Sequence, residues 1–294
     1  MKKRVFRRAS DDPALLCDLL VARLSLTFEA ALDLVDRGGV YVDSERVTAA
    51  RRKIAVGEKL TVHVTPATLV APPIVVVYRD DDLAIVDKPT GLPSQAETGQ
   101  RAYCLDAMAT RDLGPEARLM HRLDKEASGL VLVAVQRSAY APLQQAMIAH
   151  QIDRRYLAIV DGELRGEGTI RKRIGRHPRD QRLRAPFPED SPAGETACTH
   201  YRTLAHGAFD GREVTAVELR LETGRTHQIR VHLWSIEHAI VGDASYGGPA
   251  FERMCLHAYA LELPHPRDGS PIRAGAHIPD SFARLAPGLT RPFT

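Results

Sequence analysis

The sequence predicts an α+β protein: a large domain with a mainly antiparallel mixed sheet flanked by helices, preceded by a small α/β domain. Beyond residue 74, short strands follow one another, as in IVVVYRDDDLAIVDKP (74–89) and LVLVAV (130–135). Helical patterns interrupt them irregularly, chiefly at 137–149 and 226–237. Strands that mostly succeed each other favour antiparallel pairing over a regular repeat of parallel strands and helices.

The first 64 residues predict a separate small domain. LLCDLLVARL (15–24) and FEAALDLVDRG (28–38) carry apolar residues at helical spacing, and glycines end the second helix. Two alternating segments follow, VYVDSERV and EKLTVHV, which are typical of half-buried strands. The basic start, MKKRVFRR, is interpreted as an arm. TPATLVAPP (65–73) is rich in proline and predicts a linker, so the large domain should span 74–294.

Composition excludes several classes of protein. The 294 residues are 44% hydrophobic and 26% charged, as in ordinary globular proteins that bury a core. No apolar run approaches the roughly 18 residues of a membrane span, and the N-terminus does not resemble a secretory signal, so we expect a cytoplasmic protein without membrane contacts. The four cysteines are scattered, without zinc-type or disulfide-type spacing. We therefore expect no metal.

Four segments contain the candidate catalytic and RNA-binding residues. In sequence order they are HRLDKEASGL (121–130), RRYLAIV (154–160), ETGRTHQIRVHL (222–233) and VGDASYGG followed by LHAYALELPHP (241–266). Taken alone, the aspartate of the first segment would be interpreted as part of a surface salt bridge. Together, the four resemble the RluA-type pseudouridine synthases, which carry HRLD, basic-Tyr-x-A, GR-[ST]-HQ and GD-x-x-YG motifs in this order. The likeness extends over almost the whole chain, including an N-terminal domain of the S-four RNA-binding type found in the RluC and RluD branch.

The resemblance implies roles for individual residues. Asp124 matches the catalytic aspartate, Tyr156 the active-site tyrosine that stacks on the base, and Arg230 the arginine that pairs with the aspartate. The RNA-binding candidates come from two of the segments. Arg122 matches the arginine that helps to displace the target base, and His121 lies beside it in the first segment. Arg225 and His227 belong to the third segment.

The chemistry of pseudouridylation suits these residue types. The enzyme breaks the glycosidic bond of a uridine, turns the uracil and rejoins it through carbon 5. A carboxylate near the anomeric carbon can act as nucleophile or proton acceptor, much as in retaining glycoside hydrolysis. Attack on the sugar, addition to the base and proton abstraction from the ribose all need the same carboxylate. A stacked base must also be extruded, and an aromatic side chain offsets part of that cost. No step requires a cofactor.

The resulting hypothesis is a monomeric RNA pseudouridine synthase acting on structured RNA. Large-subunit (23S) ribosomal RNA is the favoured substrate, because the additional RNA-binding domain is usual in that branch of the family, and transfer RNA is the alternative. A catalytically idle RNA-binding or ribosome-assembly factor is the alternative from another class, and a nucleosidase would release free uracil. The segment 165–184 holds eight Lys or Arg and two acids, and it is interpreted either as a solvated face or as a phosphate clamp.

Overall fold

The computed structural model describes residues 2–36, 38–47, 49–64, 74–95 and 104–289. The predicted linker, 65–73, lies outside the described residues. The chain divides into two compact units, one made of residues 1–74 and 92–115 and the other of residues 75–91 and 116–294.

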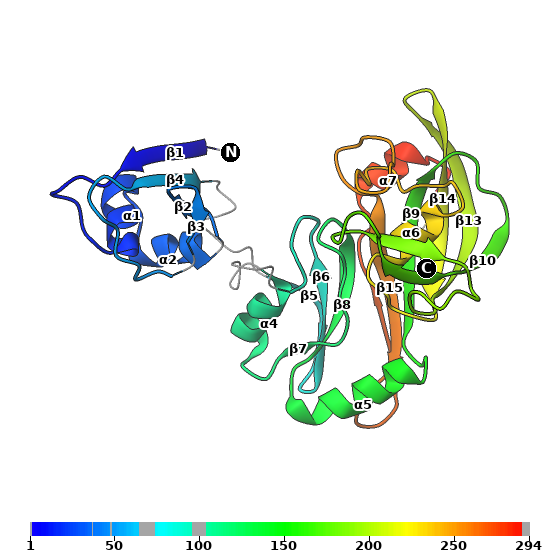
Figure 1. The fold of residues 1–294 in the computed structure, drawn as a ribbon. Coiled ribbons are helices and arrows are strands. Elements are labelled where there is room, and N and C mark those ends of the chain that lie inside the picture. Colours follow the sequence, from blue (N-terminus) through cyan, green and yellow to red (C-terminus); the bar gives the residue numbers. More distant parts are fainter. Residues whose placement is uncertain (1, 37, 48, 65–73, 96–103, 290–294) are drawn as a thin grey trace. The chain divides into compact units, whose positions relative to one another are not determined.

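The first unit has a four-stranded antiparallel sheet that shares one core with the helices at residues 16–24 and 28–36 (Figure 1). Its sheet has the order β1-β4-β2-β3. The helices match the predicted segments closely, whereas the expected N-terminal arm is wrong, because Lys2–Arg7 form a strand paired along its length with Lys59–Val64. The elements are β1 (Lys2–Arg7), α1 (Leu16–Leu24), α2 (Phe28–Asp36), β2 (Val40–Val42), β3 (Glu45–Arg46), β4 (Lys59–Val64) and α4 (Leu105–Leu113).

The second unit is built on a ten-stranded sheet, whose central path runs β10-β13-β14-β9-β15-β8-β6-β5. Every pairing in it is antiparallel except the parallel contact of β15 with β8, which confirms the predicted mainly antiparallel mixed sheet. The strands are β5 (Val75–Arg79), β6 (Leu83–Lys88), β7 (Arg118–Leu119), β8 (Ser128–Ala134), β9 (Asp153–Asp161), β10 (Glu167–Arg171), β13 (Cys198–Phe209), β14 (Arg212–Leu221), β15 (Leu256–Pro264) and β16 (Pro271–Gly275).

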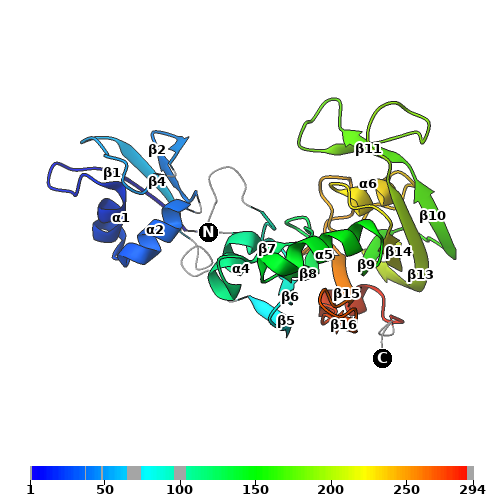
Figure 2. The ribbon, with the colours of Figure 1, turned by 90° about the horizontal axis from the view of Figure 1, so that it is seen from below.

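Helices and one separate hairpin complete this unit: α5 (Arg137–Ile148), α6 (Gln228–Trp234), α7 (Asp280–Leu285), β11 (Arg173–Arg176) and β12 (Arg184–Phe187). Helix α5 packs on β8 with one apolar face, as its predicted spacing requires. The β11–β12 hairpin lies beside α6, and Figure 2 shows its loop extending from the sheet. Residues 173–184 of the basic segment, 165–184, therefore belong to this hairpin.

Candidate active site

Asp124 lies in the short loop that leads into β8. All seven residues of β8 are buried, so the loop emerges from the centre of the sheet. At the start of the strand Gly129 has a φ of +108°, and a Cβ there would lie 2.2 Å from the carbonyl oxygen of Ala258. Only glycine allows β8 to approach β15 this closely. The strand contact therefore fixes where the Asp124 loop leaves the sheet.

Arg230 is positioned by a tight turn before α6. Buried Gln228 closes this turn: its side-chain oxygen accepts hydrogen bonds from Thr223 Oγ1 (2.7 Å) and from the backbone N–H of Arg225 (2.9 Å). The amide nitrogen of Gln228 donates to the carbonyl of Cys198 on β13. The turn is thus tied to the sheet, and the helix that follows holds Arg230 in a fixed direction.

The guanidinium of Arg230 joins two carboxylates. Its Nη1 donates to Asp124 Oδ2 at 3.2 Å, while Nε and Nη2 donate to the two oxygens of Asp243 at 2.7 and 2.8 Å. The side chains of Arg230 and Asp243 are 3% and 1% exposed, whereas Asp124 is 15% exposed. Burial opposes the charge of Arg230, but Asp243 and then Asp124 outweigh it and raise the pKa of the guanidinium. Asp124 therefore reaches solvent, whereas Asp243 does not, and the exposed carboxylate of Glu126 lies 4.0 Å from the same Nη1.

An aromatic side chain covers the other face of this network. The guanidinium of Arg230 lies 4.9 Å from the ring centroid of Tyr246, a cation–π contact. The hydroxyl of Tyr246 accepts a hydrogen bond from the N–H of Arg184 and lies 2.8 Å from Nδ1 of His227. Burial lowers the pKa of His227, against the opposing effect of Asp124. We infer that the imidazole of His227 is neutral and that its Nδ1 accepts a hydrogen bond from the hydroxyl of Tyr246.

Tyr156, on β9, lines the same small pocket as Asp124. The pocket has about 50 Å³ of space and is lined by Arg122, Leu123, Asp124, Ala127, Tyr156, Leu221, Arg225, His227, Gln228, Ile229, Arg230 and Leu256. Tyr156 is 4% exposed, and burial raises the pKa of its phenol, with Asp124 acting in the same direction. The phenol is therefore neutral at physiological pH and presents a ring and a hydroxyl to the pocket.

The RNA-binding candidates occupy different environments. Arg122 and Arg225 line the pocket; Arg122 is exposed, while Arg225 forms an ion pair with Glu195 and donates to the carbonyl of Thr196. His121 is not among the lining residues. Its Nε2 accepts a hydrogen bond from the N–H of Leu132 on β8, and burial lowers the pKa of its imidazole to about 3.

Three residues around Asp124 and Arg230 had no role assigned from the sequence. Asp243 and Tyr246 belong to the VGDASYGG segment, which marked the region without indicating which side chains face Asp124. Lys88 is fully buried, and its Nζ donates to the carbonyls of Pro89 and Lys125, the residue after Asp124. Burial lowers the pKa of Lys88 to about 7, with Asp124 opposing the shift. In the sequence, the signal for Lys88 was its place in a DKP turn (87–89) at the end of a buried strand.

The comparisons with known proteins agree with this fold. Residues 82–235 match the RNA pseudouridylate synthase family. The chain therefore belongs to the RNA pseudouridine synthases, and within them to the RluA type. The predicted enzyme class, an isomerase, is confirmed. No helix in the described part of the chain is long and apolar enough to cross a bilayer.

The particular relatives narrow the likeness to RluD. "Ribosomal large subunit pseudouridine synthase D" of Xanthomonas campestris is 38% identical, over 87% of this chain and 82% of the relative. The protein of the same name from Vibrio vulnificus is 36% identical, over 86% and 84%. Among solved structures, human RNA pseudouridylate synthase domain containing 1 is 28% identical with a TM-score of 0.60, covering 75% of this chain and 91% of that one.

Proposed function

We propose that this enzyme converts uridine to pseudouridine in large-subunit ribosomal RNA, with Asp124 as the catalytic carboxylate. The contact between Arg230 and Asp124 carries the proposal. It supplies a partly exposed carboxylate, held by a buried cation, at the mouth of a pocket. The large-subunit substrate is supported by the names of the relatives, and such a substrate implies work in the cytoplasm.

The cation explains how Asp124 performs its role. The guanidinium of Arg230 is held in place by the two hydrogen bonds that it donates to Asp243. Nη1 of the same guanidinium then orients one oxygen of Asp124 toward a nucleotide that enters the pocket.

Tyr156 and Arg122 are proposed to hold the displaced nucleotide. Tyr156 offers an apolar ring beside Asp124, against which an extruded uracil can stack, and stacking offsets part of the cost of unpairing. The exposed guanidinium of Arg122, at the rim, is suited to occupy the space the base leaves in the RNA. Arg225 and His227, also at the pocket, are proposed to contact the RNA backbone and the flipped nucleotide.

The β11–β12 hairpin is proposed to clamp RNA phosphates near the pocket. The N–H of Arg184 on β12 donates to the hydroxyl of Tyr246, so the hairpin is anchored directly to the residue that covers Arg230. Its exposed arginines, Arg176 and Arg179 among them, then lie on a support that is fixed relative to the site. The N-terminal domain, 1–64, is proposed to add affinity for RNA, joined by 65–73 to a catalytic domain spanning 74–294.

Tritium release tests the reaction and the substrate together. Large-subunit ribosomal RNA and transfer RNA transcripts carrying tritium at uracil carbon 5 would be incubated with the full-length enzyme, and both tritium in water and free uracil would be followed. We expect release from ribosomal RNA alone, without free uracil. Release from transfer RNA alone would mean that transfer RNA, and not ribosomal RNA, is the substrate. Free uracil would indicate a nucleosidase, and no release from either pool would favour an idle RNA-binding factor.

A further inference from the structure

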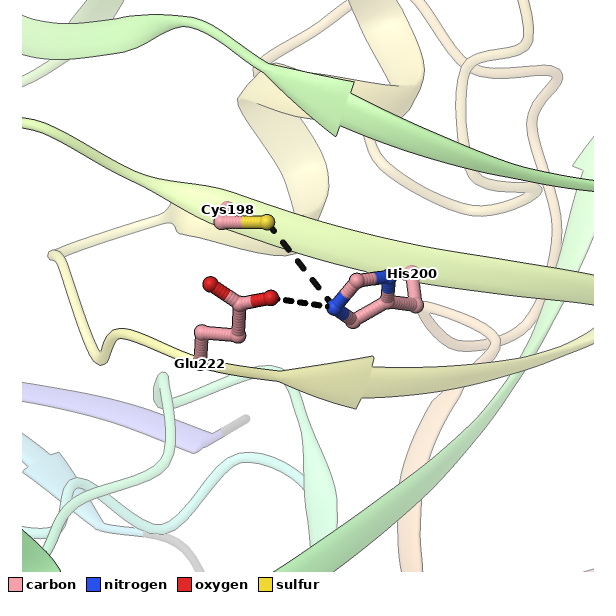
Figure 3. Close-up of side chains that lie close together, drawn as sticks. All are labelled: Cys198, His200 and Glu222. Atoms are coloured by element: carbon pink, nitrogen blue, oxygen red, sulfur yellow. Dashed lines mark hydrogen bonds and ion pairs between the residues drawn. The ribbon is translucent and has the colours of Figure 1, made fainter. Parts of the chain in front are cut away.

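Three potential metal ligands, none of which lines the Asp124 pocket, meet where β13 begins and β14 ends: Cys198, His200 and Glu222 (Figure 3). Cys198 and His200 are two positions apart on β13, so their side chains point to the same face. Glu222 directly follows β14, and its N–H donates to the carbonyl of Cys198. Strand pairing therefore brings the thiol, imidazole and carboxylate together from two neighbouring segments.

The contacts converge on one nitrogen. His200 Nε2 lies 2.6 Å from Glu222 Oε1 and 3.9 Å from Cys198 Sγ, and the three ligand atoms all lie within 4.8 Å of one another. In a nucleophile relay the base uses one ring nitrogen for the nucleophile and the other for the orienting carboxylate. Here Cys198 and Glu222 both face Nε2, so the three side chains cannot act as such a relay. They instead converge from three directions, as the ligands of a metal ion do.

The other ring nitrogen is already held. Nδ1 of His200 lies 2.9 Å from Thr169 Oγ1 on β10. Metal-bound histidines usually have their second nitrogen fixed in this way by a hydrogen-bond partner, which orients the ring. If Nδ1 carries the proton, Nε2 presents a lone pair toward Glu222 and Cys198, and a cation between them would remove the resulting repulsion.

We propose that Cys198, His200 and Glu222 bind a divalent transition metal of the Zn²⁺ type. Sulfur, nitrogen and oxygen donors together select zinc over magnesium or calcium, which prefer oxygen ligands alone. Tetrahedral zinc would need the nitrogen and carboxylate oxygen about 3.4 Å apart. Glu222 can make this small outward movement because its side chain is 49% exposed.

The surroundings provide a fourth ligand position and an opposing charge. A cavity of about 220 Å³ adjoins Cys198 and Glu222, which leaves room for water, and Glu189 also lines it. Arg171, opposite Cys198 across the β10–β13 pair, repels a cation, so the donor set decides the preference. Burial raises the pKa of the Cys198 thiol to about 11, so metal binding has to release the thiol proton.

Metal binding here would brace the turn before α6. Glu222 is followed by Thr223, whose hydroxyl accepts a hydrogen bond from the N–H of Cys198. The carbonyl of Cys198 accepts from Gln228, the residue that closes the turn. A metal joining Cys198 to Glu222 would therefore stiffen this corner, and we expect it to raise the unfolding temperature of the protein.

Cobalt provides the spectroscopic test. Full-length protein without a histidine tag, stripped with a chelator, would be titrated with Co²⁺ and then with Zn²⁺ against a chromophoric chelator. We expect one equivalent, with a near-ultraviolet charge-transfer band from the Cys198 thiolate that Cys198→Ser removes. His200→Gln and Glu222→Gln should each weaken Zn²⁺ affinity by more than about 100-fold, and Thr169→Val by about 10- to 100-fold, as for partners that orient a ligand.

Two control variants match the loss of an imidazole. His206→Gln removes an exposed histidine from the same strand, and His265→Gln removes one from the oxygen-rich cluster with Asp80 and Asp82. Both should retain the cobalt band and the Zn²⁺ affinity. The proposal is wrong if no thiolate band forms, or if the band survives Cys198→Ser in protein that unfolds at the wild-type temperature without metal. Either failure would leave the proposed pseudouridine synthase activity untouched.

Discussion

Asp243 occupies Nε and Nη2 of Arg230, and so it directs the remaining nitrogen, Nη1, at Asp124. Asp243→Asn keeps the shape but removes the charge that compensates a buried guanidinium. Breaking one partner of a buried pair costs about 3–5 kcal/mol of stability. Misdirection of Nη1 should also lower kcat by about 100-fold, the effect of small displacements in a catalytic site.

The surface variant Asp161→Asn is the control for this prediction. Asp161 pairs with Arg212, whose side chain is 60% exposed, so its loss should cost about 1 kcal/mol or less. Urea unfolding and single-turnover assays on saturating RNA would measure both effects. Wild-type kcat in Asp243→Asn would mean that Arg230 does not need this support.

Acid should destabilise the protein through His257, which is 1% exposed. Nδ1 of His257 lies 2.8 Å from the hydroxyl of Ser128, which accepts a hydrogen bond from Arg253. Burial and then Arg253 lower the pKa of His257 to about 3. Below the unfolded pKa of about 6.5, the unfolded chain binds a proton that the folded chain does not. The contribution of His257 to the free energy of unfolding is therefore present above pH 6.5 and is lost as the pH falls. At pH 5 the loss is roughly 2 kcal/mol.

His257→Asn tests that assignment because its side-chain oxygen can still accept from Ser128. The loss of stability between pH 7 and pH 5, measured by urea unfolding, should be smaller than in wild type by roughly 2 kcal/mol. The same substitution at exposed His150 is the control for removing one imidazole. An unchanged pH dependence in His257→Asn would assign the acid sensitivity to other groups.

RNA affinity should depend on salt through the β11–β12 hairpin. Each lost phosphate contact reduces the slope of log affinity against log salt by about 0.7 to 0.9. The double variant Arg176→Gln, Arg179→Gln should thus flatten the slope by about 1.5, with kcat on saturating RNA retained. Arg212→Gln with Arg273→Gln removes two exposed arginines outside the hairpin and should leave the slope unchanged. Equal slopes in both variants would argue against a clamp.

The local elements of the fold were predictable because their signals lie within a few residues. The apolar spacing at 137–149 predicts α5, and LVLVAV predicts a fully buried strand, which is β8. The helix expected at 226–237 forms only at Gln228–Trp234, because His227 adopts a left-handed conformation before it. β1 was missed because its charged residues indicate an arm, and only pairing with β4, more than fifty residues away, makes it a strand.

Residues of the site could be predicted only where they stand at a functional position of a family motif. Asp124 and Arg230 were chosen by resemblance, and the structure brings them into contact. Asp243 and Lys88 were not chosen, because their importance arises from the packing of distant segments. The parallel contact of β8 with β15 joins residues 129 positions apart, and neither spacing nor composition indicates it.

The most direct test of the account compares wild type with Asp124→Asn on the RNA that supports tritium release. We expect Asp124→Asn to abolish release while binding the same RNA with nearly unchanged affinity, since the substitution removes the charge and keeps the size of the side chain. An unchanged unfolding temperature would exclude a folding defect. Release at a substantial fraction of the wild-type rate would remove Asp124 from the mechanism and contradict the central claim.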